Sequence, residues 1–190
     1  MEFRTKVDIP RATFSIAPCE RMLFVGSCFA DNMGRKFAED KFRAVVNPFG
    51  VMYNPASIMH TVERYEGEAP RVAVLTLGTN HIYILRETGE IVDNCNKRPQ
   101  RLFEERSLTA NECAGYLMRA VRHLQSRCAE VKVIVTVSPI RYAKYGYHGS
   151  MLSKATLLLA ADMLEKQMPD VVTYFPAYEI VNDELRDYRF

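Results

Sequence analysis

The stretch Leu23–Ala38, with the sequence LFVGSCFADNMGRKFA, decides the fold of this chain. Its apolar start predicts a buried strand, and the spacing of Met33 and Phe37 among polar and charged residues predicts an amphipathic helix after it. Ser27 stands at the joint between the two. Ligands bind where the strands of α/β proteins end, so Ser27 could present a nucleophilic hydroxyl at the rim of the sheet. Serine is also a common helix cap, and both roles stay open at this point.

Strand and helix patterns alternate through the rest of the chain. Val72–Leu77 is the clearest further strand, and Thr109 with Glu112 forms a capping box ahead of a long helical pattern. His81–Leu85 and Glu90–Val92 flank a turn and predict a β-hairpin. Further strands are expected at 43–46, 131–137 and 171–174, and helices at 31–42, 55–66, 109–128, 153–168 and 177–185.

This alternation predicts a mostly parallel sheet with helices on both faces. We expect an α/β fold, a three-layer α/β/α sandwich with a five-stranded sheet, formed by a single domain over residues 1–190. The tyrosine- and glycine-rich segment Arg141–Ser150 is expected to be a loop.

Composition points to an ordinary globular protein of the cytoplasm. The formal net charge of +2 is too small to indicate a nucleic-acid or membrane partner, and no apolar run approaches the ~20 residues of a membrane helix. The first residues carry no apolar core of an export signal. The 5 cysteines are odd in number and contain no CxxC pair, which indicates free thiols and disfavours disulfides or structural zinc. No metal or organic cofactor is expected, because no ligand cluster or phosphate loop is present.

Three predicted strands end in residues that could build a site. The first ends at Ser27, the second at Asn47–Gly50 and the third at Gly78–Asn80. The carboxyl ends of parallel strands share one edge, so a serine nucleophile, backbone N–H groups and an asparagine amide can converge there. Taken singly, Gly50 and Asn80 are ordinary turn or cap residues.

These segments carry a family resemblance. Together with others in the same order, they resemble the GSCFA family, which takes its name from residues 26–30. The segments are GSCFA (26–30), NPFGVMYNP (47–55), TLGT (76–79), NC (94–95), TVSPIR (136–141), LSKA (152–155) and YFP (174–176). The family is similar to the SGNH, or GDSL-like, hydrolases, so the resemblance implies a flavodoxin-like α/β/α sandwich.

The resemblance also implies roles for individual residues. Ser27 takes the place of the nucleophile, and Gly50 takes the place of the glycine whose N–H helps to form the oxyanion hole. Asn80 matches the asparagine in the third conserved sequence block of the SGNH hydrolases, and Asn94 is the alternative candidate for that position. The relatives often have a histidine after Cys95, where this chain has Asn96.

The histidine that acts as the catalytic base in SGNH hydrolases has no counterpart in this sequence. The family pattern continues past Phe190 into an Asp-x-x-His segment, so we expect a truncated domain with weak or no hydrolase activity. His148, in the predicted loop, is either an exposed surface residue or a substrate contact or base. Arg141 and Asn94 are the other candidate substrate contacts. Cys28 lies at a helix N-terminus, which favours a reactive thiolate, but we expect it to point into the core.

The resulting hypothesis is an SGNH-like serine acyl-ester hydrolase or acyltransferase, with an O-acylated carbohydrate or other small molecule as substrate. The alternative is a non-catalytic domain of the same fold that binds a carbohydrate or small ligand through this edge and the tyrosines of residues 141–150. A flavodoxin-like domain that binds a nucleotide at this edge is a third reading.

Overall fold

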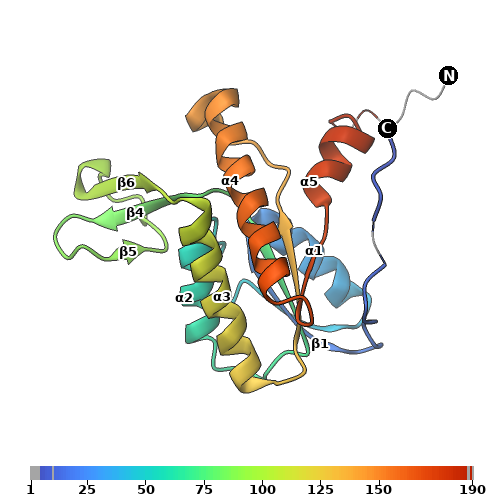
Figure 1. Cartoon of the computed structure of the whole chain (residues 1–190). Coiled ribbons are helices and arrows are strands. Elements are labelled where there is room, and N and C mark those ends of the chain that lie inside the picture. The colour runs from blue at the N-terminus through green and yellow to red at the C-terminus, as the bar shows by residue number, and fades with distance from the viewer. Residues whose placement is uncertain (1–4, 10, 188, 190) are drawn as a thin grey trace.

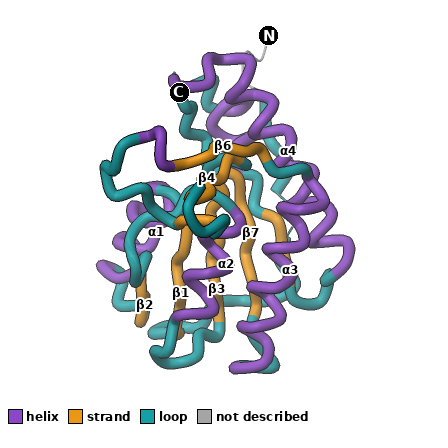
Figure 2. Tube along the Cα trace, turned by 90° about the vertical axis from the view of Figure 1, so that its left-hand side faces the viewer, coloured by secondary structure: helices purple, strands orange, loops and turns teal. Residues whose placement is uncertain are grey.

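The structure, a computed structural model, describes residues 5–9, 11–187 and 189. Its centre is a five-stranded parallel sheet in the order β2-β1-β3-β7-β8. The strands are β1 (Arg21–Gly26), β2 (Arg43–Val46), β3 (Val72–Leu77), β7 (Lys132–Val137) and β8 (Val172–Tyr174). Helices lie on both sides of this sheet in Figures 1 and 2, which confirms the predicted three-layer α/β/α fold.

The two faces of the sheet carry separate apolar cores. The larger core packs α2 (Pro55–Arg64), α3 (Ala110–Arg127) and α4 (Gly146–Gln167) against one face. The smaller core packs α1 (Cys28–Glu39) against the other face, with Phe14 and Ile16 beside it. A short α5 (Ala177–Glu179) and a π-helical turn, Ile180–Glu184, follow β8. Every residue of β3 is buried, as expected for a central strand covered on both faces.

Local capping explains where two helices begin. Asn54 accepts the Ser57 N–H at 2.9 Å ahead of Pro55 at the first helical position of α2. The capping box of Thr109 and Glu112 predicted for α3 is present, with both reciprocal hydrogen bonds.

A small antiparallel sheet projects from the carboxyl end of β3, at the left of Figure 1. It consists of β4 (His81–Leu85), β5 (Ile91–Val92) and β6 (Phe103–Ser107), in the order β5-β4-β6, with a 3-10 turn, Gln100–Leu102, before β6. The predicted hairpin corresponds to β4 and β5, whereas β6 was not expected.

The expectation of a loop over residues 141–150 is wrong in part. A 3-10 turn, Ala143–Tyr145, leads directly into α4, which begins at Gly146 rather than at Ser153. His148 therefore lies in the first turn of a helix and not in a loop.

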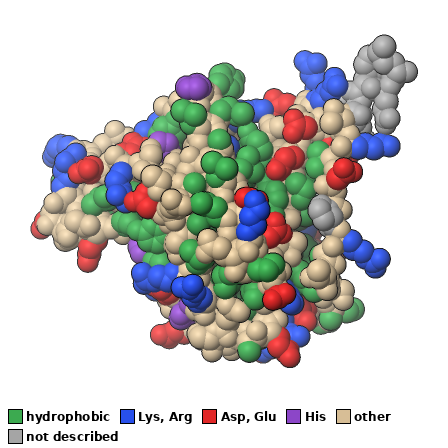
Figure 3. Space-filling model, in the orientation of Figure 1, with side chains coloured by type: hydrophobic (Ala, Val, Ile, Leu, Met, Phe, Trp, Pro, Cys, Tyr) green, Lys and Arg blue, Asp and Glu red, His purple; other side chains and the backbone are tan. Residues whose placement is uncertain are grey.

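Charged side chains are interspersed over the face shown in Figure 3, without a patch of one sign. Within the described ranges, the helices are too short or too polar to cross a membrane.

Candidate active site

The end of β1 is fixed to both neighbouring strands. A Cβ added to Gly26 would lie 2.2 Å from the Thr76 carbonyl oxygen of β3, and Gly26 has φ +146°, so only glycine fits there. The Gly26 N–H donates to Asn47 Oδ1 at 2.8 Å, beyond β2. Asn47 Nδ2 in turn donates to Asp31 Oδ1 of α1 at 2.6 Å. The first two predicted strand ends are therefore joined to the start of α1.

Ser27 caps α1. Its side chain is fully buried, its Oγ accepts the Phe29 N–H at 3.3 Å, and that Oγ lies 3.1 Å from Thr76 Oγ1. The capping role, one of the two predicted, is confirmed. In this conformation the hydroxyl faces β3 and not an open surface. Its role as a nucleophile stays a prediction.

The other two predicted oxyanion groups already have hydrogen-bond partners. The Gly50 N–H donates to the Asn47 carbonyl at 2.8 Å within an exposed turn. Asn80 is buried, and its Nδ2 donates to the Leu108 carbonyl at 2.7 Å, next to the start of α3. Both residues have the turn or packing role that was the alternative for them. Their oxyanion roles remain predictions.

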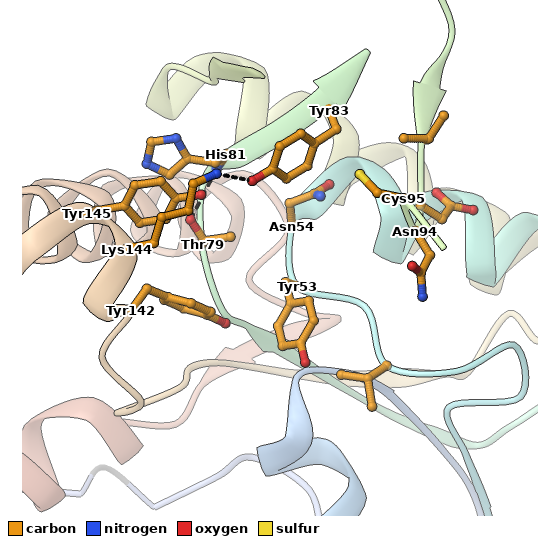
Figure 4. Close-up of a pocket in the computed structure, with 13 residues that line it drawn as sticks. Tyr53, Asn54, Thr79, His81, Tyr83, Asn94, Cys95, Tyr142, Lys144 and Tyr145 are labelled. Carbon is orange, nitrogen blue, oxygen red and sulfur yellow. Dashed lines mark hydrogen bonds between the residues drawn. The ribbon is translucent and has the colours of Figure 1, made fainter. Parts of the chain in front are cut away.

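A cleft of about 280 Å³ opens beside these strand ends. It lies between the loop before α2, the small antiparallel sheet and the segment before α4 (Figure 4). Aromatic side chains dominate its wall, and the residues that line it include Tyr53, His81, Tyr83, Tyr142 and Tyr145. Tyrosine rings of this kind offer both stacking surfaces and hydroxyl groups to a polar ligand.

One wall of the cleft is a network of charges and rings. His81 stacks on Tyr145 with 3.9 Å between ring centroids, and burial lowers the pKa of His81. Lys144 Nζ donates to Glu105 at 2.7 Å, and the Tyr145 hydroxyl donates to the same carboxylate at 2.6 Å. Burial acts to raise the pKa of Glu105, but these hydrogen bonds hold it below the usual value. The network fixes the rings of this wall in place.

The three predicted substrate contacts lie in different places. Asn94 lines the wall of the cleft opposite Lys144 and Tyr145 (Figure 4), and its Oδ1 accepts the Asn96 N–H at 2.8 Å. Arg141 binds Asp187 at 2.7 Å and so ties the β7–α4 connection to the C-terminal segment. His148 is exposed on α4. Of these three residues, Asn94 lines the cleft, whereas Arg141 and His148 do not.

Two tyrosines lie against Gly78, at the end of β3: Tyr142, which belongs to the predicted tyrosine-rich segment, and Tyr53, which sequence reasoning missed. A Cβ on Gly78 would meet the Tyr142 hydroxyl at 2.4 Å and the Tyr53 ring at 3.3 Å, so glycine is needed for this close approach. The two rings meet edge to face, with centroids 5.9 Å apart. The Tyr142 hydroxyl oxygen is buried and has no hydrogen-bond partner among the described residues. Burial, with the nearby Tyr53 and Cys28, raises the pKa of Tyr142, so this hydroxyl remains a donor.

Lys154 is the second missed residue of the site. It is only 2% exposed, and its Nζ donates to the carbonyls of Gly78 and Ser138, both at 2.6 Å. Burial lowers the pKa of Lys154 to about 7, and the proximity of Cys28 acts in the opposite direction. A sequence signal existed, because Lys154 shares its helical face with the buried Leu157 and Ala161, three and seven residues on.

Cys28 corrects an expectation. It is the first residue of α1 and is partly exposed, whereas we expected it in the core. The pKa of Tyr53 is raised, mainly by burial and to a smaller extent by the nearby Cys28 thiol. In Figure 4 the Tyr53 ring points towards the start of α1, drawn in blue. Across the described ranges, His, Cys, Asp and Glu side chains do not gather in groups of three that could hold a metal.

Comparison with known families supports the resemblance seen in the sequence. The model of the GSCFA family matches residues 21–71 and 67–190. The two matched segments include all three strand ends, the cleft and α4. A comparison with curated proteins found no match.

Proposed function

The chain belongs to the GSCFA family, and on this basis we propose that it catalyses acyl transfer, as an ester hydrolase or an acyltransferase. The observation that carries the proposal is the convergence of three strand ends at the start of α1, beside an aromatic cleft. A side chain at this joint would attack the carbonyl carbon of an acyl ester. The positive end of the α1 dipole, at its N-terminus, would stabilise the oxyanion that forms.

The lining of the cleft supports an O-acylated carbohydrate as substrate. Sugar rings pack on aromatic faces, and their hydroxyls find partners in tyrosine and amide groups. Tyr53, Tyr83 and Tyr145 supply such faces, and Asn94 supplies an amide on the opposite wall. The acyl group would then point to the joint, where Ser27, the predicted nucleophile, and Cys28 are adjacent.

The purified protein tests this proposal in an assay with 4-nitrophenyl acetate and 4-nitrophenyl butyrate. We expect weak turnover that still exceeds the buffer rate, with loss of turnover in Ser27→Ala or Cys28→Ala. The exposed Cys19 supplies the control, because Cys19→Ala should keep the wild-type rate. Equal rates in the wild type and in both joint variants would refute the proposal, as would the absence of turnover in the wild type.

The second candidate is carbohydrate binding without catalysis, and the buried state of the Ser27 hydroxyl favours it. It predicts saturable binding of an acetylated oligosaccharide, measured by calorimetry, with no release of acetate. Tyr83→Ala should weaken that binding, because it removes one aromatic wall of the cleft.

A further inference from the structure

Cys28 and Lys154 lie near one another at the carboxyl edge of the parallel sheet. Cys28 begins α1 directly beyond the end of β1, and its thiol is close enough to Lys154 to act on the pKa of that amine. The Gly78 carbonyl accepts a hydrogen bond from Lys154 Nζ. The thiol at the start of α1 and the amine inside α4 therefore reach this edge of the sheet from two different helices.

The two residues at the joint have divided roles. The Ser27 hydroxyl is turned inward and caps α1, whereas Cys28, the next residue, is partly exposed. A nucleophilic side chain must be accessible to attack a substrate. Of Ser27 and Cys28, only Cys28 is accessible.

Lys154 has the surroundings of a functional amine. Its two hydrogen bonds go to main-chain carbonyls, and none of the ion pairs among described residues gives it a carboxylate. A neutral amine has two N–H groups and one lone pair, so these two carbonyls satisfy both donors and leave the lone pair available. A buried lysine without a carboxylate is costly, and such groups concentrate at functional sites.

The third member of the cluster is Tyr142. Its hydroxyl is buried against Gly78 without a partner, and Lys154 Nζ lies 5.4 Å from the centroid of its ring. Buried polar groups almost always have a hydrogen-bond partner, so this hydroxyl indicates an acceptor that a ligand would bring. Tyr142 lines the cleft, so a substrate carbonyl bound there would supply that acceptor.

We propose that Cys28 is the nucleophile of this site, that Lys154 accepts its proton, and that the Tyr142 hydroxyl donates to the substrate carbonyl oxygen. The reaction rests on the acyl transfer proposed above, but the reactivity of the thiol does not.

The step balances without a further reactant. The Cys28 proton moves to the Lys154 amine, and Sγ forms a bond to the acyl carbon while the carbonyl electron pair moves to oxygen. When that pair returns, the C–O bond of the ester breaks, and the leaving alkoxide takes the proton from Lys154. Water or an acceptor alcohol then attacks the thioester, gives its proton to the released thiolate, and regenerates Cys28 with the acid or the new ester.

Alkylation by iodoacetamide at pH 7, read for each cysteine by peptide mass spectrometry, tests the thiol directly. Cys28 should react about tenfold faster than Cys19, although Cys19 is the more exposed. Only the thiolate reacts, and in the proposal Lys154 takes the proton from Cys28 but not from Cys19. Lys154→Met should slow Cys28 about tenfold and leave Cys19 unchanged. Lys154→Arg, which keeps a positive charge, should restore part of the rate.

The buried Cys113 reports on folding in the same samples, since it should stay protected in each variant. A variant that exposes Cys113 is set aside, and Lys154→Gln replaces it. Equal rates at Cys28 and Cys19 in the wild type overturn the proposal. So does a Cys28 rate that is unaffected by the loss of Lys154 in a folded variant.

Failure of the acyl transfer and failure of this inference give different results. A fast, Lys154-dependent Cys28 without ester turnover keeps the thiol and rejects the proposed function. Ester turnover that survives in Cys28→Ala and disappears in Ser27→Ala, together with slow alkylation of Cys28, keeps the proposed function and rejects Cys28 as the nucleophile.

Discussion

Replacement of Gly26 by alanine tests whether the joint between β1 and α1 is built as described. The added Cβ would lie 2.2 Å from the Thr76 carbonyl oxygen and 2.4 Å from Thr76 Oγ1. The first of these is a backbone atom of the central strand β3, so it cannot move aside as a flexible side chain would. Gly26 also has φ +146°, a conformation that strains any residue with a Cβ.

The two effects together set the expected magnitude. Overpacking and backbone strain each cost about 1–3 kcal/mol, so Gly26→Ala should lower the free energy of unfolding by about 4 kcal/mol. For a chain of 190 residues this corresponds to a fall in Tm of about 8–16 °C. Urea unfolding followed by circular dichroism at 222 nm measures it.

Two other glycines separate the contributions. Gly89 has φ +72° with no atom near its added Cβ, so Gly89→Ala should cost only the strain, about 1 kcal/mol. Gly115 lies inside α3 with open space around it, so Gly115→Ala should stabilise the protein by about 1 kcal/mol. If Gly26→Ala proved no more destabilising than Gly89→Ala, the close packing of Gly26 on Thr76 would be wrong.

Three further predictions concern stability. The folded-state pKa of Lys154, about 7, lies below that of an unfolded lysine, so the unfolded chain binds more protons above pH 7. The wild type should therefore gain about 2 kcal/mol over Lys154→Met between pH 7 and pH 9, measured by urea unfolding at each pH, and parallel pH curves would contradict this. Leu157→Ala, in the core, should cost about 2–5 kcal/mol, whereas Leu159→Ala, 59% exposed on the same helix, should change the unfolding free energy by less than about 0.5 kcal/mol; similar losses would place α4 in the wrong rotation. Asn54→Ala should lower Tm, equivalent to about 1 kcal/mol, because it removes the cap of α2, and an unchanged Tm in thermal melts would argue against that cap.

Local sequence signals predicted most of the fold. The buried strands and the capping box at Thr109 were visible because the residues that determine them are neighbours in the chain. Strand β6 was not, because Phe103–Ser107 has the sequence FEERS, and its extended conformation comes from pairing with β4, residue by residue from Leu85 with Phe103 to His81 with Ser107. The early start of α4 was missed because Gly146 and Gly149 indicated a turn.

The site was predictable only at the level of which strand ends share an edge. The parallel neighbours β2, β1 and β3 do bring the three segments together. The direction of each side chain depends on contacts that are distant in sequence, such as those of Ser27 with Thr76 and of Asn80 with Leu108. Lys154 was overlooked because a lysine in a helix is normally solvated, and its two carbonyl partners come from strand ends 16 and 76 residues away.

The inward turn of Ser27 and the exposure of Cys28 are two consequences of one arrangement, and this affects how activity data should be interpreted. Because the Ser27 hydroxyl caps α1, Ser27→Ala should lower stability by about 1 kcal/mol and loosen the start of the helix that carries Cys28. Loss of turnover in Ser27→Ala is therefore expected whether Ser27 attacks the substrate or only holds Cys28 in place. An acyl group trapped on the protein during turnover would separate the two roles. Neutral hydroxylamine cleaves a thioester on Cys28 far faster than an ester on Ser27. An acyl group found on Ser27 would mean that this hydroxyl leaves its buried position during the reaction, and that the cap breaks each time the enzyme turns over.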